Sequence, residues 1–221
     1  DDSFYAGSRT MDEEATQRGA AMVDAGASWV DIGGESTRPG AAPVSVETEL
    51  MRVLPVIQGL RDARPDALIS IDTRHAKVAE AALEAGADMV NDVSGLRDPA
   101  MMELVLRTGC AVCIMHMQGE PKTMQVEPQY SDVVNEVSAV LAKTKQTLIE
   151  QGHPPELIVI DPGIGFGKTH EHNLELLGAG RRLLLNDGPV LWGVSRKSVV
   201  GHLTGCLLYT SDAADETEGV V

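Results

Sequence analysis

The sequence has little positive charge, few cysteines and no long apolar run, and each shortage argues against a class of protein. Its 18 lysines and arginines face 33 acidic residues, which leaves a net charge of −15 at pH 7. A nucleic acid or an anionic membrane would be repelled by most of such a surface. No apolar run approaches the roughly 20 residues that span a bilayer, and the first residues do not resemble a signal peptide. These shortages predict a cytoplasmic protein that binds neither nucleic acid nor membranes.

The three cysteines are too few for a disulfide framework. Cys110 and Cys113 form a C-x-x-C, but they lie in CAVCIMHM (110–117), which has the pattern of a strand. Residues three apart on a strand point to opposite faces. We expect buried structural thiols, because the alternative of a zinc or redox motif lacks a second C-x-x-C that would complete four ligands.

Short apolar runs alternate with helical patterns along the whole chain. Runs of Val, Ile, Leu and Met are typical of parallel strands covered on their faces. Glycines at 26, 86, 109 and 152 stand where a left-handed residue ends a helix before the next strand. At 221 residues the chain predicts one α/β domain. The apolar runs are WVDIGG (29–34), LISIDT (68–73), MVNDVS (89–94), AVCIMHM (111–117), LIVIDPG (157–163) and PVLWGVS (189–195).

Polar side chains follow nearly every apolar run, and their distribution distinguishes two architectures. In a closed barrel the carboxyl ends of all strands meet at one mouth, whereas an open doubly wound sheet concentrates its site at one switch point. We therefore expect a TIM (β/α)₈ barrel. The strand-end residues are Asp31, Glu35, Ser36, Thr37, Arg38, Asp72, Thr73, Asn91, Asp92, His116, Asp161, Ser195, Arg196 and Lys197.

Asp72 and Asp161 each end a strand within Ile-Asp, and we expect both to be functional. A buried carboxylate is costly unless a donor meets it, so the pair implies a partner such as an amino-pyrimidinone ring. Asp92 has an alternative role as the cap of the turn that follows it. His116 is interpreted either as a ligand or base, or as an imidazole at the edge of the core. The run 170–172 (HEH) lacks the H-E-x-x-H spacing and is expected to be a solvated helix start.

Two cations have candidate roles near these carboxylates. Arg38 lies in GGESTRPGAA (33–42), a connection whose length is typical of a lid or binding loop. It is expected to clamp a phosphate when the lid closes, with an exposed loop arginine as the alternative. Lys197, in VSRKS (194–198), is expected to place an ammonium beside the carboxylates and to hydrogen-bond a carbonyl.

The stretch DPGIGFGKT (161–169) is similar to a phosphate-binding P-loop, G-x-x-x-x-G-K-[ST]. Here Gly163 stands one residue too close to Gly167, and Pro162 has no N–H to offer a phosphate. The sequence therefore argues against a P-loop and leaves the role of Lys168 open.

Several motifs together resemble the bacterial dihydropteroate synthases. They occur in the order and at the spacing of that family, over residues 2 to about 205. The resemblance implies a transferase of folate biosynthesis that condenses 6-hydroxymethyl-7,8-dihydropterin pyrophosphate with 4-aminobenzoate and releases pyrophosphate, with Mg²⁺ as cofactor and sulfonamides as competitors. It also implies a homodimer. The motifs are GGESTRPGA (33–41), SIDT (70–73), NDVSG (91–95), MHMQGEPKTMQ (115–125), DPGIGFGK (161–168) and GVSRKS (193–198).

The resemblance also implies roles for particular residues. The catalytic set would be Asp72, Asp161, Lys197 and Arg38. The pterin-binding set would be Asp72, Asn91, Met115, Asp161, Gly165, Gly193 and Lys197. The aminobenzoate-binding set would be Thr37, Arg38, Pro39, Phe166, Lys197 and Ser198.

The sequence departs from the family pattern at both ends. The family has a first strand whose asparagine holds Mg²⁺, and that strand would precede Asp1; its R-x-H motif on the eighth strand has no counterpart after Lys197. We therefore expect residues 1–205 to form a partial barrel with six of eight strands, the first and last missing, and with impaired activity. Residues 206–221 (CLLYTSDAADETEGVV) resemble translated adapter sequence, with a natural acidic tail as the alternative.

Two other functions stay open at this point. A pterin-binding methyltransferase domain shares the barrel and the Asp/Asn pterin edge, but it transfers a methyl group to a corrinoid. A non-catalytic barrel fragment would at most retain pterin binding.

Overall fold

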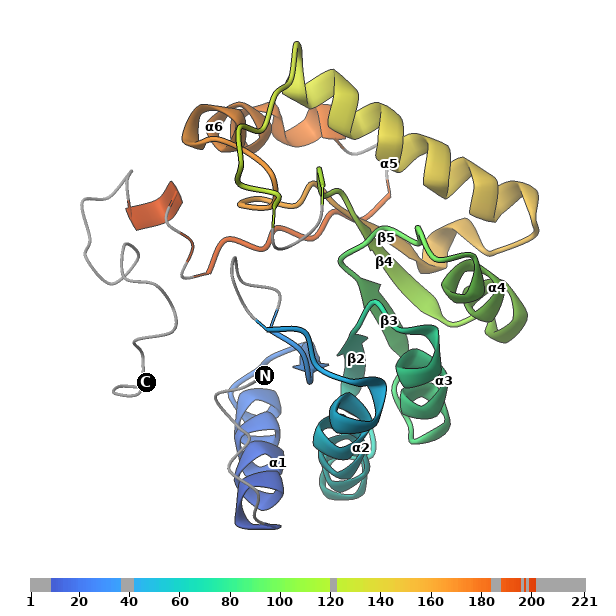
Figure 1. Ribbon diagram of the computed structural model, residues 1–221. Coiled ribbons are helices and arrows are strands. Elements are labelled where there is room, and N and C mark those ends of the chain that lie inside the picture. Colours follow the sequence, from blue (N-terminus) through green and yellow to red (C-terminus); the bar gives the residue numbers. More distant parts are fainter. Residues whose placement is uncertain are drawn as a thin grey trace.

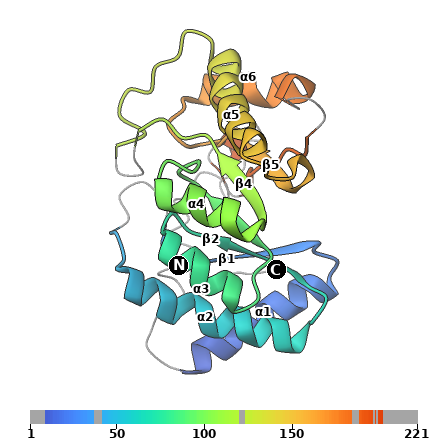
Figure 2. The same cartoon turned by 90° about the vertical axis from the view of Figure 1, so that its right-hand side faces the viewer.

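A computed structural model of the chain describes residues 9–36, 42–119, 123–183, 188–195, 197 and 199–201. These residues form a parallel sheet and the helices that connect its strands (Figures 1 and 2). The strands are β1 (Trp29–Gly33), β2 (Leu68–Asp72), β3 (Met89–Asp92), β4 (Ala111–Met115) and β5 (Ile158–Asp161). The helices are α1 (Arg9–Asp24), α2 (Val46–Ala63), α3 (Ala76–Glu84), α4 (Pro99–Thr108), α5 (Val133–Glu150) and α6 (His170–Ala179), with 3-10 turns η1 (Pro155–Leu157) and η2 (Gly180–Leu183).

The strand order is that of a barrel. The strands pair in the order β1-β2-β3-β4-β5, all parallel, so each strand lies beside its predecessor in the sequence. In a doubly wound sheet the strand order would reverse at a switch point, and helices would cover both faces. In Figure 1 the helices from α1 to α5 instead follow one another around one side of the sheet. The prediction of an α/β fold of the TIM-barrel type is confirmed.

One face of the sheet is apolar and is covered by the helices. Side chains alternate between the two faces of a strand, and paired residues of neighbouring strands share a face. The helix-facing residues are at most 9% exposed, and each contributes about 1.5–3 kcal/mol by its burial. They are Val30, Ile32, Ile69, Ile71, Val90, Val112, Ile114, Ile158 and Ile160.

The opposite face, which would be the interior of a barrel, carries the polar groups. Asp31 pairs with Ser70, Asp72 pairs with Asn91, and Met115 pairs with Asp161. The strand register therefore sets the strand-end side chains side by side. We call this surface the inner face.

The sixth apolar run, expected to be a strand, forms a single bridge. Val190 pairs with Ile160, through Ile160 N–H to Pro189 O at 3.1 Å and Leu191 N–H to Ile160 O at 2.8 Å. The next donor on this side of β5 would be residue 162, which is a proline and has no N–H. Six strands were expected, and the described residues form five strands and one isolated bridge.

Local sequence signals set the helix ends as expected. Ser45 and Asp98 cap α2 and α4 with their side-chain oxygens, a contribution of about 1 kcal/mol each. The four glycines predicted to end helices all have positive φ, between 65° and 111°. Cys113 is buried and Cys110 is half-buried, and both are free thiols. No helix in the described part of the chain is both long and apolar enough to cross a membrane. The predicted tail, 206–221, lies outside the described residues.

Candidate active site

Asp72 and Asn91 lie side by side at the ends of β2 and β3 on the inner face. The Asp72 Oδ1 atom is buried and has no hydrogen-bond partner among the described residues. Burial, and then the negative charges of Asp31 and Glu49, raise the pKa of Asp72 well above its usual range. A buried acceptor without a donor is costly, so this atom favours a ligand that brings an N–H.

Asp161 ends β5 and begins the loop that follows it. Its Oδ1 accepts the Gly163 N–H at 2.7 Å, which folds the loop back over the strand end. Burial raises the pKa of Asp161, while the Gly163 hydrogen bond and the charge of Lys197 oppose the rise. Met115, its register partner, is 4% exposed and lies beside it on the inner face.

Lys197 brings an ammonium to the same place. Burial lowers the pKa of Lys197, and the charges of Asp161 and Asp72 oppose that fall. Its Nζ donates to Ile164 O at 2.5 Å and lies 4.6 Å from the centroid of the Phe166 ring. This ammonium is therefore within electrostatic range of the carboxylates at the ends of β5 and β2.

Gly193 and Gly165 keep space open around this lysine. A side-chain carbon added at Gly193 would lie 3.2 Å from Lys197 Nζ and 3.8 Å from Asp161 Oδ2. A carbon added at Gly165 would lie 3.4 Å from Lys197 Cδ. The structure thus brings together the pterin-site residues predicted from the sequence.

An apolar cluster forms a second wall beside the carboxylates. Phe166 packs against a buried group that consists of Val93, Met115, Met117 and Met124. Gln125 holds the facing loop in place through Nε2 to Gly165 O at 2.5 Å. Methionine sulfur and aromatic rings make favourable contacts with a flat heterocycle or benzene ring.

The lysine of the P-loop-like motif has a structural position instead of a phosphate-facing one. Lys168 is 3% exposed, and its Nζ contacts Phe166 O at 2.9 Å, His116 O at 3.2 Å and His116 Nδ1 at 3.1 Å. Burial lowers the pKa of Lys168 to about 7, against the attraction of Asp161. Lys168 therefore ties the loop 163–168 to the end of β4.

Three residues with two possible roles are placed by their contacts. Burial, and then the charge of Lys168, lower the pKa of His116 to about 3, so the ring is neutral and sits at the core edge. Asp92 faces the helices and accepts the Ser94 and Leu96 N–H groups at 2.7 and 2.8 Å, which is the capping role. His172 forms a capping box with Thr169 at the start of α6.

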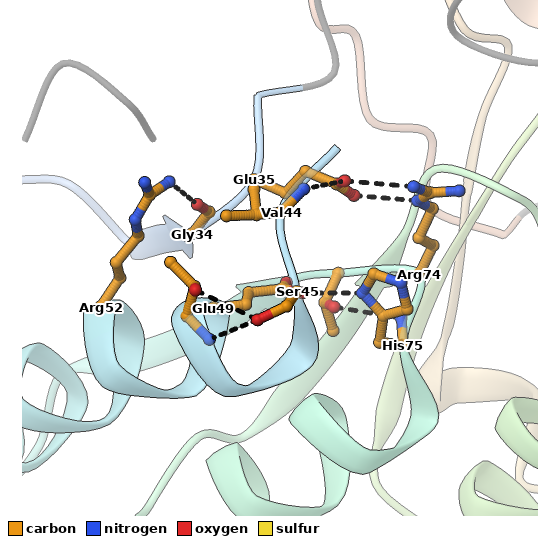
Figure 3. Close-up of polar contacts among 10 residues, drawn as sticks. Gly34, Glu35, Val44, Ser45, Glu49, Arg52, Arg74 and His75 are labelled. Atoms are coloured by element: carbon orange, nitrogen blue, oxygen red, sulfur yellow. Dashed lines mark hydrogen bonds and ion pairs between the residues drawn. The ribbon is translucent and has the colours of Figure 1, made fainter. Parts of the chain in front are cut away.

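The Glu35 carboxylate joins the described ends of the predicted lid through one ion pair and one backbone hydrogen bond (Figure 3). The Glu35 carboxylate accepts from Arg74 Nε at 2.8 Å and Nη2 at 3.1 Å, and also from Val44 N–H at 3.1 Å. Nearby, buried Glu49 contacts His75 Nδ1 at 2.8 Å. Glu35 thus joins the two ends of this connection to the segment after β2. Thr37, Arg38, Pro39 and Ser198, predicted for the aminobenzoate site, lie outside the described residues.

Replacing Arg74 with glutamine is expected to destabilise the fold by about 1–3 kcal/mol at pH 7, because the Glu35 side chain, 8% exposed, keeps its burial and loses its charged donor. Burial would raise the pKa of Glu35, but Arg74 and the Val44 N–H lower it overall. The stabilisation by the Glu35–Arg74 pair is thus present above the pKa of Glu35 in the unfolded chain, about 4.3. It is lost as the pH falls through the lower pKa of Glu35 in the folded protein. Thermal unfolding from pH 3 to 8 measures both effects.

The matched control is Arg107→Gln, because the Arg107–Glu80 pair is 58% and 48% exposed. A surface pair contributes about 0–1 kcal/mol. Equal losses for the two variants at pH 7 would contradict a special role for Glu35 and Arg74.

Sequence reasoning missed two polar groups of this region. Asp31 was noted only as a strand-end acid, although its alternation with Val30 and Ile32 places it on the inner face. The Glu35–Arg74 pair joins residues 39 positions apart, and no local pattern signals such a contact.

Comparison with known proteins agrees with this geometry. The sequence pattern of the family described as "Pterin binding enzyme" matches residues 1–218. The chain therefore belongs to the family of pterin-binding enzymes.

Its relatives within that family include dihydropteroate synthases. The chain is 47% identical over 206 residues to the dihydropteroate synthase of Mycobacterium leprae, which covers 92% of this chain and 72% of that protein. The solved Yersinia pestis dihydropteroate synthase, in complex with a sulfonamide drug, superposes with a TM-score of 0.82 at 41% identity, over 90% of this chain and 71% of that one. The Xanthomonas albilineans dihydropteroate synthase with 7,8-dihydropteroate superposes with a TM-score of 0.80 at 39% identity, over 93% and 72%. The resemblance inferred from the motifs is confirmed.

Proposed function

We propose that this chain is a dihydropteroate synthase, which joins 6-hydroxymethyl-7,8-dihydropterin pyrophosphate to 4-aminobenzoate and releases pyrophosphate. The observation that carries the proposal is the set of acceptors on one inner face, at Asp72, Asn91 and Asp161, with the Lys197 ammonium beside them. A pterin ring presents the complement, because its amino-pyrimidinone edge is rich in N–H donors and carries a carbonyl.

The proposed reaction needs no protein nucleophile. When pyrophosphate leaves, the pterin methylene becomes cationic, and the carboxylates of Asp72 and Asp161 stabilise that charge. The C–O bond to pyrophosphate breaks, the aminobenzoate nitrogen forms the new C–N bond, and the proton that this nitrogen loses passes to water or to the departing pyrophosphate. Phe166 and the methionines beside it exclude water from the cation.

In this proposal Lys197 acts as a donor to the pterin carbonyl. Its Nζ already faces the loop carbonyl of Ile164, and its stem lies against Gly165. Arg38 would act on the leaving phosphates; this role stays a prediction from the sequence, as do the aminobenzoate contacts of Thr37, Pro39 and Ser198.

The Mg²⁺ implied by the resemblance also stays a prediction. In the described parts of the chain no group of three His, Cys, Asp or Glu side chains is placed to hold a metal ion. No step above depends on one. A cytoplasmic location, a homodimer, competition by sulfonamides and impaired turnover likewise stay predictions.

The test is an assay of the purified chain with both substrates and Mg²⁺, measuring pyrophosphate release and dihydropteroate formation, together with calorimetry of pterin binding. We expect pterin binding and some aminobenzoate-dependent pyrophosphate release. Pterin binding without pyrophosphate release would favour a non-catalytic fragment. Methyl transfer to a corrinoid, again without pyrophosphate release, would favour the methyltransferase. Absence of pterin binding would overturn the proposal itself.

A further inference from the structure

Asp31 links two inner-face residues without being part of the predicted site. Its Oδ1 accepts the Ser70 hydroxyl at 2.6 Å, and its Oδ2 accepts the Asn91 amide through Nδ2 at 3.1 Å. These three residues come from β1, β2 and β3, and the register sets Asp31 directly beside Ser70. The hydrogen bonds therefore form a chain across three strands that ends at Asn91.

The donors and acceptors in this row of hydrogen bonds fix the orientation of the Asn91 amide. Burial raises the pKa of Asp31, but the hydrogen bonds from Ser70 and Asn91 favour its ionised form, which accepts and does not donate, whereas an amide has one accepting and one donating end. Asp31 must therefore face the NH₂ group of Asn91, which directs the Asn91 Oδ1 atom away from Asp31. Ser70 occupies the other carboxylate oxygen and holds the carboxylate in this orientation.

This orientation matters because Asn91 is the register neighbour of Asp72. Asp72 Oδ1 is a buried acceptor without a partner among the described residues. An Asn91 amide released from Asp31 would turn its NH₂ group toward that acceptor and occupy it. With Asp31 in place, Asp72 and Asn91 instead present two adjacent acceptors to a ligand.

We propose that Asp31 is a positioning residue for pterin recognition, which orients the Asn91 amide and keeps the neighbouring Asp72 acceptor available to the ligand. This inference rests on the proposed function. It assigns Asp31 an indirect action, through Asn91, and no contact with the reacting atoms.

Calorimetric titration with 6-hydroxymethylpterin tests this role in a double-mutant cycle. Asp31→Ala and Asn91→Ala are each expected to weaken binding by about tenfold, which corresponds to the loss of one hydrogen bond to a charged or fixed partner. In the Asn91→Ala background, adding Asp31→Ala is expected to weaken pterin binding by less than about twofold, because the partner of Asp31 is already gone. A purely structural role would give the same loss in both backgrounds.

A conservative variant separates orientation from charge. Asp31→Asn has an oxygen that can accept from Asn91 and an NH₂ that can donate to Ser70, so binding is expected to stay within about threefold of the unchanged chain. Asp66→Ala, in the exposed turn before β2, removes the same charge elsewhere and should leave binding unchanged.

Three results would overturn the role of Asp31: wild-type affinity in Asp31→Ala, equal losses in the two backgrounds, or an Asp31→Asn variant as weak as Asp31→Ala. Should Asp31→Ala fail to fold, the Asp31→Asn result decides alone, since rescue supports orientation and loss refutes it. If the unchanged chain binds pterin and Asp31 proves irrelevant, the proposed function still stands. If the unchanged chain does not bind pterin, the proposed function fails first.

Discussion

Replacing Asp72 with asparagine is expected to weaken pterin binding by about 10- to 150-fold and at the same time to raise the melting temperature at pH 7. The loss of affinity corresponds to about 1.5–3 kcal/mol, the contribution of a hydrogen bond to a charged group. The gain in stability follows from the raised pKa of the Asp72 carboxyl, which is caused by burial and by the charges of Asp31 and Glu49.

The pH dependence gives the sign of this stability effect. A carboxyl whose pKa is higher in the folded state favours folding while protonated, and that contribution is lost as the pH rises through the folded pKa. A carboxyl at this buried position therefore costs the ligand-free protein stability at pH 7, and asparagine removes this cost. We expect a gain of about 2–4 °C for each kcal/mol, which disappears below about pH 4, where the carboxyl is protonated in both states.

Asp92→Asn is the matched control, because Asp92 ends the neighbouring strand on the opposite face and accepts the N–H groups of Ser94 and Leu96. Burial raises the pKa of Asp92 as well, so the deciding measurement for this control is calorimetry, in which we expect the variant to keep its pterin affinity. A stabilised Asp72→Asn that still binds pterin normally would remove Asp72 from the site.

The second large effect is expected for Gly163→Ala, which should destabilise the fold by about 2–5 kcal/mol. Gly163 has a φ of 68°, and a methyl group at this position would overlap the carbonyl oxygen of His116. A left-handed conformation costs an alanine about 1–2 kcal/mol, and overpacking adds about 1–3 kcal/mol. Because the Gly163 N–H holds the Asp161 carboxylate, pterin affinity should fall with stability.

Gly109→Ala isolates the backbone part of this effect. Gly109 has nearly the same φ, 65°, but nothing lies within 4 Å of the methyl position. Urea unfolding should give about 1–2 kcal/mol for Gly109→Ala and a clearly larger loss for Gly163→Ala. Equal losses would show that the His116 carbonyl moves aside easily.

The sequence was sufficient to predict the five strands and their polar ends, because apolar runs followed by polar residues and helix-ending glycines are local signals. The convergence of Asp72, Asn91 and Asp161 followed from barrel geometry alone, since parallel strands end at one edge. The single bridge at Val190 was not predictable from apolarity, because pairing stops at Pro162, the residue that follows β5 and has no N–H to donate. The contacts of Lys168 depend on a loop folding back over β4, which no spacing in the motif encodes.

The separation of the sheet into an apolar face and a polar face has an evolutionary consequence. Each strand places stabilising and ligand-facing residues at alternate positions, as Ile71 and Asp72 do in β2. Deleting one residue inside such a strand would turn the later residues of that strand to the opposite face, so that stabilising and ligand-facing residues exchange places. Fold and recognition would be lost in the same event, so this lineage should accept length changes only in its loops, while its strands change by substitution.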